Sequence, residues 1–215
     1  MRIFMRLSLV AIVIAGPAIA QAQDADLRAL ENRARAGDVL AQFELGSRFD
    51  IGTGVRRNPK TAEYWYRLAA DAGNADAQNA VGSMLQDRRK YEEARAWYEK
   101  AAAQAHPQGT NNLAYLYDLG LGVPQDRGRG KELYLAAAKL GWGEAMWNLA
   151  NMAALGQAGP VDWFATCVWT QRTLNSSQAA KGTLRDRAGQ GMHELKSRLP
   201  PEETERCRAE ADKPL

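Results

Sequence analysis

The residues that could carry out catalysis are few, and their spacing matches no common active site. A serine hydrolase of the β-lactamase or penicillin-binding type needs a Ser-x-x-Lys nucleophile motif. No lysine stands three positions after any of the five serines beyond the N-terminal segment, which are Ser47, Ser83, Ser176, Ser177 and Ser197. There is no Gly-x-Ser-x-Gly elbow, and His106 and His193 alone cannot supply the usual ligands of a hydrolytic zinc site. We therefore predict that the protein is not an enzyme and holds no metal or cofactor.

Cys167 and Cys207 are the only cysteines of the chain. In an exported protein, a sparse and even number of cysteines favours one disulfide bond. Such a bond would close a loop of about 40 residues and stabilise the fold by roughly 4 kcal/mol through lost chain entropy. The alternative is two separate thiols.

The first 22 residues have the layout of a secretory signal peptide. Arg2 and Arg6 form a basic start, and the apolar run at residues 7–20 is shorter than the roughly 20 residues that span a bilayer. Small-x-small patterns predict cleavage after Ala20 or Ala22, and the alternative is an uncleaved anchor. We expect a periplasmic protein, or alternatively a secreted one, with no stable membrane insertion after cleavage. With 28 Lys+Arg against 25 Asp+Glu the chain is nearly neutral, so we predict no nucleic-acid partner.

Beyond this segment, two short patterns recur in step, at intervals of 32 or 36 residues. The first begins as Ala41-Gln-Phe-Glu-Leu45-Gly46 and returns around Val81, Leu113 and Leu149. The second is an aromatic pair in the series Trp65-Tyr66, Trp97-Tyr98, Leu133-Tyr134 and Trp169-Thr170. A repeat of this length is typical of stacked helical hairpins. We therefore predict an all-α fold, a solenoid of about four helix-turn-helix repeats with helical caps at both ends.

Each repeat is expected to contain a leading and a trailing amphipathic helix, in units at residues 38–73, 74–105, 106–141 and 142–177. Gly52 and Gly120 are suited to end leading helices, because glycine enters the left-handed region at little cost. Asn58 before a proline, and Asp126, are suited to cap trailing helices. The second unit lacks the glycine loop. The Gly-x-Gly segments follow predicted helices rather than strands, so we interpret them as turns and not as phosphate-binding loops.

The two ends of the repeat array differ from its middle. Residues 24–37 align with a trailing helix and are interpreted as a half-repeat, so that the solenoid is expected over residues 23–177. Residues 178–215 are expected to form a C-terminal helical cap. One longer helix is predicted there from an apolar stripe made of Ala180, Leu184, Ala188, Met192, Leu195 and Leu199. A short final helix is predicted from Pro200-Pro201 to about Ala211, and a bond from Cys167 to Cys207 would attach it to the last unit.

Three motifs together resemble the Sel-one-like repeat (SLR) family, a relative of the tetratricopeptide repeat. They are Ala-Gln-Phe-x-Leu-Gly-x-x-Phe from Ala41, Gly-x-Gly-Val at residues 52–55 and 120–123, and Trp-Tyr-x-x-Ala-Ala-x-x-Gly from Trp65. The resemblance covers residues 24–177. It implies a right-handed superhelix whose leading helices line a concave face, and a role as an adaptor in protein complexes. Family members with a disulfide in each unit bind or hydrolyse β-lactams, and this chain lacks those per-unit cysteine pairs.

We therefore expect an exported scaffold or regulator that binds a partner protein or peptide on its concave face. One alternative is a hydrolase or binding protein acting on β-lactam or cell-wall compounds. Another is a structural subunit of an envelope assembly.

The exposed positions of the leading helices are the candidates for partner contact. One repeated position holds Glu44, Ala80, Asn112 and Asn148. A second, also expected to be exposed, holds Arg48, Met84, Leu116 and Met152. The two asparagines either bind an extended peptide or hydrogen-bond to neighbouring helices. The candidate partner-binding residues are Glu44, Arg48, Asn112, Tyr115, Trp142, Trp147 and Asn148.

Two tryptophans among these candidates have open interpretations. Trp147 replaces Asn79 and Asn111 of the second and third units, and Phe43 holds the position in the first unit. Trp147 either fills the core or anchors a partner, since tryptophan is enriched at interfaces. Trp142 lies in a turn, at the position of Asn74 and His106, where we expect partial exposure.

Overall fold

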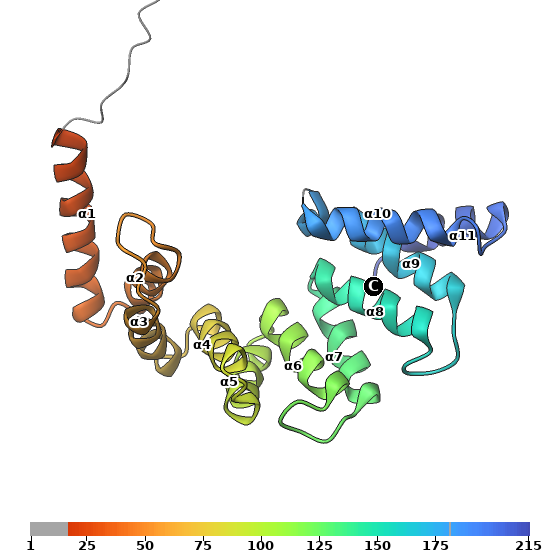
Figure 1. Cartoon of the computed structure of the whole chain (residues 1–215), viewed down its shortest axis with the longest axis horizontal. Helices are drawn as coiled ribbons and strands as arrows, with labels where there is room; N and C mark the ends of the chain where they lie inside the picture. The colour runs from red at the N-terminus through yellow and green to blue at the C-terminus, as the bar shows by residue number, and fades with distance from the viewer. Residues whose placement is uncertain (1–16, 181) are drawn as a thin grey trace, which may run out of the picture.

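A computed structural model describes residues 17–180 and 182–215 of the chain. Within these ranges the chain forms eleven α-helices, one 3-10 helix and no strand, and the helices follow one another along an arc (Figure 1). The elements are α1 (Pro17–Arg35), α2 (Val39–Ile51), α3 (Pro59–Asp71), α4 (Ala75–Asp87), α5 (Tyr91–Ala103), α6 (Pro107–Leu119), α7 (Arg127–Lys139), α8 (Gly143–Leu155), α9 (Trp163–Asn175), η1 (Ser177–Ala180), α10 (Thr183–Leu195) and α11 (Pro201–Ala211).

Consecutive helices pair into hairpins, and each hairpin packs against the next. The pairs are α2–α3, α4–α5, α6–α7 and α8–α9. In the first two pairs, α2 and α4 lie on the side that faces the hollow of the arc, and α3 and α5 lie outside (Figure 1). Among the leading helices, α4 and α6 touch each other directly, because elements on the inner side of a curved stack come closer together. The predicted all-α solenoid of helix-turn-helix repeats is confirmed.

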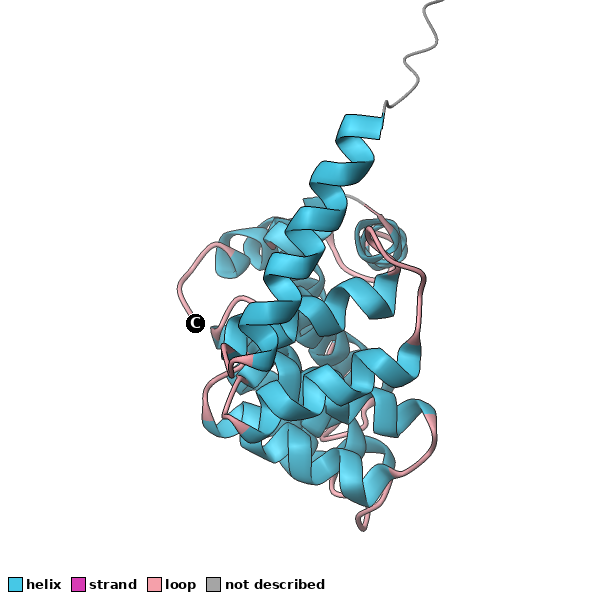
Figure 2. Cartoon of the chain, turned by 90° about the vertical axis from the view of Figure 1, so that its left-hand side faces the viewer, coloured by secondary structure: helices cyan, strands magenta, loops and turns pink. Residues whose placement is uncertain are grey.

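The N-terminal part of the predicted signal peptide lies outside the described residues. The helix α1 begins at Pro17, ahead of both predicted cleavage positions, and continues through most of the expected half-repeat. Leu30 and Ala34 are buried where α1 packs on α2, and the view along the array shows α1 standing at its end (Figure 2). No helix of the described part of the chain is both long and apolar enough to cross a membrane.

Helix ends are set by local residues, as the sequence predicts. The side chain of Asn58 accepts a hydrogen bond from the backbone N–H of Thr61, and that of Asp126 accepts one from Arg129 at 2.8 Å. Each bond satisfies one of the free N–H groups of a first helical turn. Gly52 and Gly120 end α2 and α6 with φ of 90° and 69°, in the left-handed region.

The start of α8 is capped from a distance. In the second and third units, the side chains of Asn74 and His106 accept the capping hydrogen bonds. Trp142 occupies this position in the fourth unit, and an indole N–H can only donate. The side-chain oxygen of Gln178, in η1, replaces it by accepting from the backbone N–H groups of Gly143 at 2.6 Å and Glu144 at 3.3 Å.

Buried tyrosines hold the two helices of the first three units together. Tyr66, Tyr98 and Tyr134 are 5%, 0% and 1% exposed. The ring of Tyr98 lies so close to Gly82 that a Cβ there would be 2.5 Å from a ring carbon, which explains why this position is glycine. Burial raises the pKa of Tyr98 to about 12, so its hydroxyl stays protonated at neutral pH.

The C-terminal cap differs in part from its prediction. The prediction of a single longer helix is wrong. Helix α10 has 13 residues, like the helices of the repeats, and Leu199 lies beyond its end. Gly182, at φ 94°, separates α10 from η1, because a residue in that region cannot continue a right-handed helix. The final helix is confirmed as α11. Both α10 and α11 pack on α9, and Cys167 and Cys207 form the disulfide that joins α11 to α9.

Asp118, at the end of α6, is a buried carboxylate whose Oδ1 atom accepts no hydrogen bond. Burial raises the pKa of Asp118, and Arg127, with its Nε atom 3.8 Å from Oδ1, offsets this only in part. The charged form is therefore disfavoured in the folded state. The cost to stability is absent below the pKa of the unfolded chain, grows as the pH rises towards the folded pKa, and is complete above it.

We expect Asp118→Asn to raise the free energy of unfolding by about 1 kcal/mol at pH 7, because it removes the charge and keeps the shape. The gain should disappear below about pH 4, where the carboxyl group of Asp118 is protonated in the unfolded chain as well as in the folded protein. Urea unfolding at both pH values measures this difference. Asp87→Asn, at the exposed end of α4, is the matched control and should change stability little. A gain that is equal at both pH values would contradict the explanation.

Candidate partner-binding surface

Each leading helix carries an exposed stripe of side chains. Its residues are spaced by three or four positions, so they share one side of the helix. We call this set the inner surface, and it consists of Leu40, Glu44, Ser47 and Ile51 on α2, Asp76, Ala80, Ser83 and Asp87 on α4, Gln108, Asn112, Tyr115 and Leu119 on α6, and Glu144, Asn148, Asn151 and Leu155 on α8. All of these side chains are exposed or partly exposed.

A chain of asparagine side chains crosses the middle of the inner surface. The Nδ2 atom of Asn148 donates to Asn111 at 3.1 Å, and that of Asn112 donates to Asn79 at 3.0 Å. A longer bond of 3.4 Å, from Asn111 to Asn112, connects the two pairs. Asn112 and Asn148 therefore do hydrogen-bond to neighbouring helices. Each amide nitrogen carries two hydrogens, so both residues, which are partly exposed, keep a second N–H group for other acceptors.

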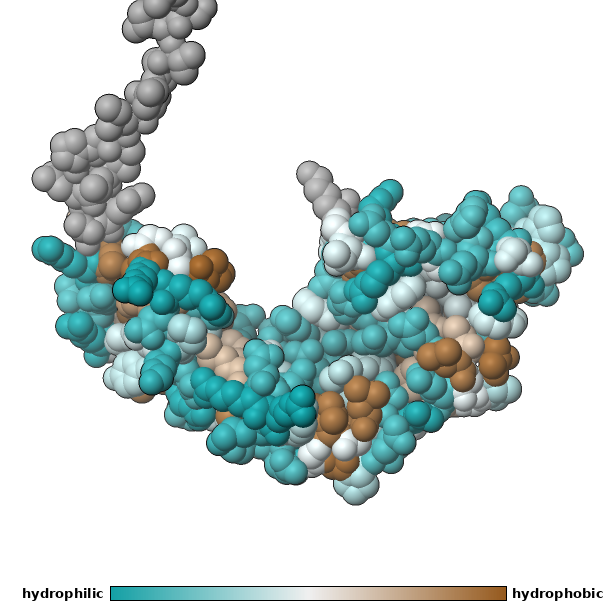
Figure 3. All heavy atoms as spheres, in the orientation of Figure 1, coloured by the Kyte–Doolittle hydropathy of each residue, from teal (hydrophilic) through white to brown (hydrophobic). Residues whose placement is uncertain are grey.

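Apolar side chains gather at the loop edge of the inner surface. Tyr115, Leu119 and Leu155 are 39%, 45% and 66% exposed, and Ile51 occupies the position of the two leucines in the first unit at 71%. Patches of apolar residues lie over the ends of α2, α6 and α8, with hydrophilic surface between them (Figure 3). Exposed apolar patches can mark surfaces for interaction.

The second repeated position is not exposed throughout, and this prediction is wrong for two of its residues. Leu116 and Met152 are buried, at 0% and 3% exposure. Four residues advance a helix by about 400°, so this position turns some 40° past the first one and into the neighbouring helix. The stripe instead continues through the position three residues on, which holds Tyr115.

Glu44 and Arg48 form an ion-pair network with Asp26 at the N-terminal end of the array. The Arg48 guanidinium contacts both carboxylates at 2.7 Å, and these contacts hold the pKa of Arg48 above its ordinary value. The network borders an open hollow of about 480 Å³ that Thr53 and Gly54 also line. Because these groups are partly exposed, the ion pairs add little stability.

Comparison with known proteins places the repeats in a family. Residues 39–74, 75–106 and 107–142 each match the Sel1 repeat. The crystal structure of a Sel1 repeat protein from Oxalobacter formigenes is 37% identical, with a TM-score of 0.52, and the match covers 59% of this chain and 98% of that one. The chain belongs to the Sel1 repeat family.

Other Sel1-type proteins match over part of their length. The ERAD-associated E3 ubiquitin-protein ligase component HRD3B of Arabidopsis thaliana is 34% identical over 105 residues, which are 48% of this chain and 17% of that protein. The Sel1-like repeat-containing protein L21 of Acanthamoeba polyphaga mimivirus is 31% identical over 50% of this chain and 20% of its own length. The chain therefore spans a fifth or less of these relatives.

A solved structure shares the fold over most of the chain. The protective antigen c5321 of uropathogenic Escherichia coli, which displays an SLR fold, has a TM-score of 0.79 at 19% identity. The match covers 90% of this chain and 43% of that one. Sel1 repeat proteins generally mediate protein–protein interaction and are typically non-enzymatic scaffolds.

The two candidate tryptophans take different places in this Sel1 array. Trp142 is partly buried against the main core, and its indole nitrogen is enclosed without an acceptor. Trp147 points from α8 towards α10, where its ring lies over Gly191 and the guanidinium of Arg187 is 5.7 Å from the ring centroid. Trp147 also lines a hollow between α8, α9 and α10.

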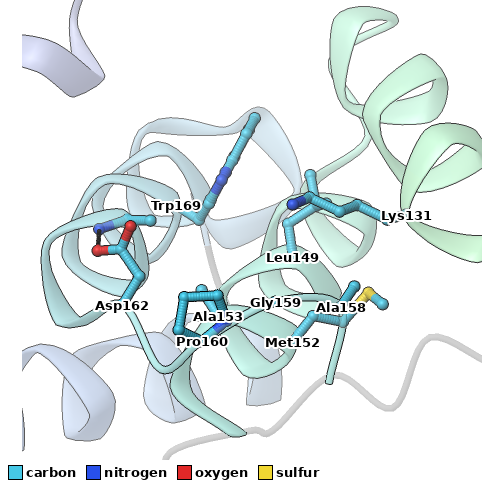
Figure 4. Close-up of a pocket in the computed structure, with 10 residues that line it drawn as sticks. Lys131, Leu149, Met152, Ala153, Ala158, Gly159, Pro160, Asp162 and Trp169 are labelled. Carbon is cyan, nitrogen blue, oxygen red and sulfur yellow. Dashed lines mark hydrogen bonds between the residues drawn. The ribbon is translucent and has the colours of Figure 1, made fainter. Parts of the chain in front are cut away.

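A second hollow, of about 190 Å³, lies where the α8–α9 loop meets α7 (Figure 4). Trp169 and Lys131 stand on its sides, and residues 158–160 form part of its wall. Asp162 is the acidic residue of the lining, and its carboxylate caps α9 by accepting from the N–H of Ala165 at 2.8 Å. Nowhere in residues 17–180 and 182–215 do three His, Cys, Asp or Glu side chains come close enough to hold a metal ion.

Proposed function

We propose that this Sel1 repeat protein is a non-enzymatic scaffold or regulator that binds a protein or peptide on its inner surface. The observation that carries the proposal is the joining of two features on α6 and α8. Partly exposed asparagines offer N–H groups to a backbone, and the apolar edge at Tyr115, Leu119 and Leu155 offers area for side chains. Main-chain hydrogen bonds combined with apolar anchors are how extended peptides are commonly recognised.

Location outside the cytoplasm is part of the proposal. A disulfide between α9 and α11 suggests a compartment that is not reducing. Together with the signal-like N-terminal segment, this supports export to the periplasm, with secretion as the alternative.

The relatives support a role in assemblies. One of them is a component of a ubiquitin ligase, and the repeats that this chain matches form a small part of that protein. The inner surface of four units fits a partner footprint of about 800 Å² on each side, the size of an ordinary specific interface.

Site-specific photocrosslinking in the native host tests this function. A photoreactive phenylalanine at Tyr115 keeps an aromatic ring on the inner surface and leaves the asparagine hydrogen bonds intact. We expect it to label one protein, whereas the same group at Ala136, which is exposed on the trailing helix α7, labels none. Leu119→Ser should lower the yield several-fold, because it removes a neighbouring apolar anchor. Equal labelling from both positions would contradict binding on the inner surface.

A further inference from the structure

A hollow of about 120 Å³ lies between α8, α9 and α10, at the C-terminal end of the inner surface. Trp147, Ala150, Asn151 and Ala154 of α8 line one side of it. The helix α9 lies opposite, and the exposed side chains of Glu194 and Arg198 stand at its rim. The remaining lining residues are Trp163, Thr166, Thr170, Gly191 and Leu195.

The repeat explains why this space is open. In the second unit, the fully buried ring of Tyr98 packs on Gly82. Its hydroxyl donates to Gln86 at 3.1 Å and also hydrogen-bonds to the hydroxyl of Ser83 at 3.3 Å. The fourth unit has residues at the same four repeat positions. The equivalents of Gly82, Ser83, Gln86 and Tyr98 are Ala150, Asn151, Ala154 and Thr170.

All four equivalents line the hollow. A tyrosine fills the corresponding space in each of the first three units, as Tyr66, Tyr98 and Tyr134. The fourth unit has Thr170 instead, whose shorter side chain donates to the backbone oxygen of Thr166 at 2.7 Å. The hollow is therefore the space of a missing tyrosine ring, and it belongs to this unit alone among the four.

The chemistry of the walls suits an aromatic ring. The indole rings of Trp147 and Trp163 are flat apolar surfaces, and the guanidinium of Arg198 lies 4.4 Å from the centroid of Trp163. Asn151 stands where Ser83 meets the hydroxyl of Tyr98, so an amide is in place for a phenol group. The volume is slightly below the roughly 150 Å³ of an apolar cavity that binds benzene.

We propose that this hollow receives a tyrosine or phenylalanine side chain of the bound protein partner. The inference rests on the proposed function and adds to it the kind of residue that anchors the partner. The tyrosine that the unit lacks is supplied by the second molecule, in contact with Trp147 and Trp163. A buried aromatic residue in a preformed pocket is the usual form of an interface anchor.

Binding of a small probe tests the pocket without the partner. N-acetyl-tyrosinamide added to the ¹⁵N-labelled protein should shift the indole N–H signals of Trp147 and Trp163 in a saturable way, and leave that of Trp65 unchanged. N-acetyl-alaninamide should shift none of them. Thr170→Tyr restores the ring of the other units and should weaken probe binding at least tenfold, whereas Thr170→Val, of similar size to threonine, should preserve it.

A second filling variant guards against misfolding of the first. Ala154→Leu fills the hollow from α8 and should also weaken probe binding at least tenfold, with an unchanged circular dichroism spectrum. Probe binding that is absent in the wild type, or that is as strong in both filled variants as in the wild type, would overturn the inference.

The partner is then tested in the same variants. With the crosslinker at Tyr115, Thr170→Tyr should lower the yield of product several-fold, and Thr170→Val should not. An unchanged yield in Thr170→Tyr overturns the aromatic anchor and leaves the proposed function intact. Failure of every inner-surface crosslink in the wild type overturns the proposed function itself.

Discussion

Replacing Tyr98 with alanine should lower the free energy of unfolding by about 4 kcal/mol, because deleting a buried aromatic ring removes its contacts and leaves a cavity. Tyr98 is fully buried and lies between the leading and trailing helices of the second unit. Gly82 of α4 lies against the ring and has no side chain that could fill the cavity left by its removal. The cavity could therefore close only if the whole helix moved. Urea unfolding followed by circular dichroism measures the change.

Tyr98→Phe is the matched control for this prediction. It keeps the ring and removes only the hydroxyl, which bonds to Ser83 and Gln86 at 3.3 and 3.1 Å. We expect a loss of about 1 kcal/mol, the usual net contribution of such hydrogen bonds. If both variants lost the same stability, the hydroxyl rather than the packing of the ring would hold the unit together.

The loss of stability in the Tyr98→Ala variant should also extend to the neighbouring units. In a solenoid, each repeat is stabilised mainly by the contacts with its neighbours. Amide hydrogen exchange should therefore become faster in α4, α5 and α6, and change less in α9 and α11. Uniform acceleration along the whole chain would indicate that the array unfolds as one unit instead.

Replacing Cys207 with alanine should destabilise the C-terminal cap by about 4 kcal/mol, because the disulfide closes a loop with a sequence separation of 40 residues. The helix α11 makes its contacts with α9, and the bond from Cys167 is its covalent connection to that helix. Without the bond, α11 depends on a small cluster that includes Val168, Leu199 and Ala211.

Amide hydrogen exchange shows whether the Cys207→Ala variant is destabilised only in the cap or along the whole chain. Amides of α11 should lose protection first, while those of α4 to α7 retain it, since the cap packs on α8 and α9 of the last unit. Cys167→Ala and reduction of the wild type with a thiol should give the same pattern, because all three break the same bond. A Cys207→Ala protein with unchanged protection in α11 would show that packing alone holds the cap.

Much of the architecture follows from local chemistry that is visible in the sequence. Asn58 and Asp126 begin helices and Gly52 and Gly120 end them, because each acts on its own turn of backbone. The regular interval between the aromatic pairs predicts one helical hairpin per repeat, since residues at one repeat position meet similar neighbours in every unit. The two cysteines, 40 residues apart, are likewise paired in the structure.

Other features depended on contacts between distant segments. The apolar stripe at residues 180–199 reads as one helix, but the left-handed backbone of Gly182 divides it. Trp142 cannot cap α8, and Gln178, some 35 residues away, does so instead. Leu116 and Met152 turn into their neighbours, because a position that is exposed in one unit is covered when the next helix packs on it.

The proposed binding surface shows the same division. The sequence alone identified the leading helices and several of their polar residues, because the periodicity assigns each residue to a face. Only the tertiary structure decided that Asn112 and Asn148 bond across helices, that Tyr115 joins an apolar edge, and that the change from tyrosine to Thr170 leaves a hollow. Periodicity specifies the side of a helix on which a residue lies. Which residues touch, and where a cavity remains, depends on which helices pack together.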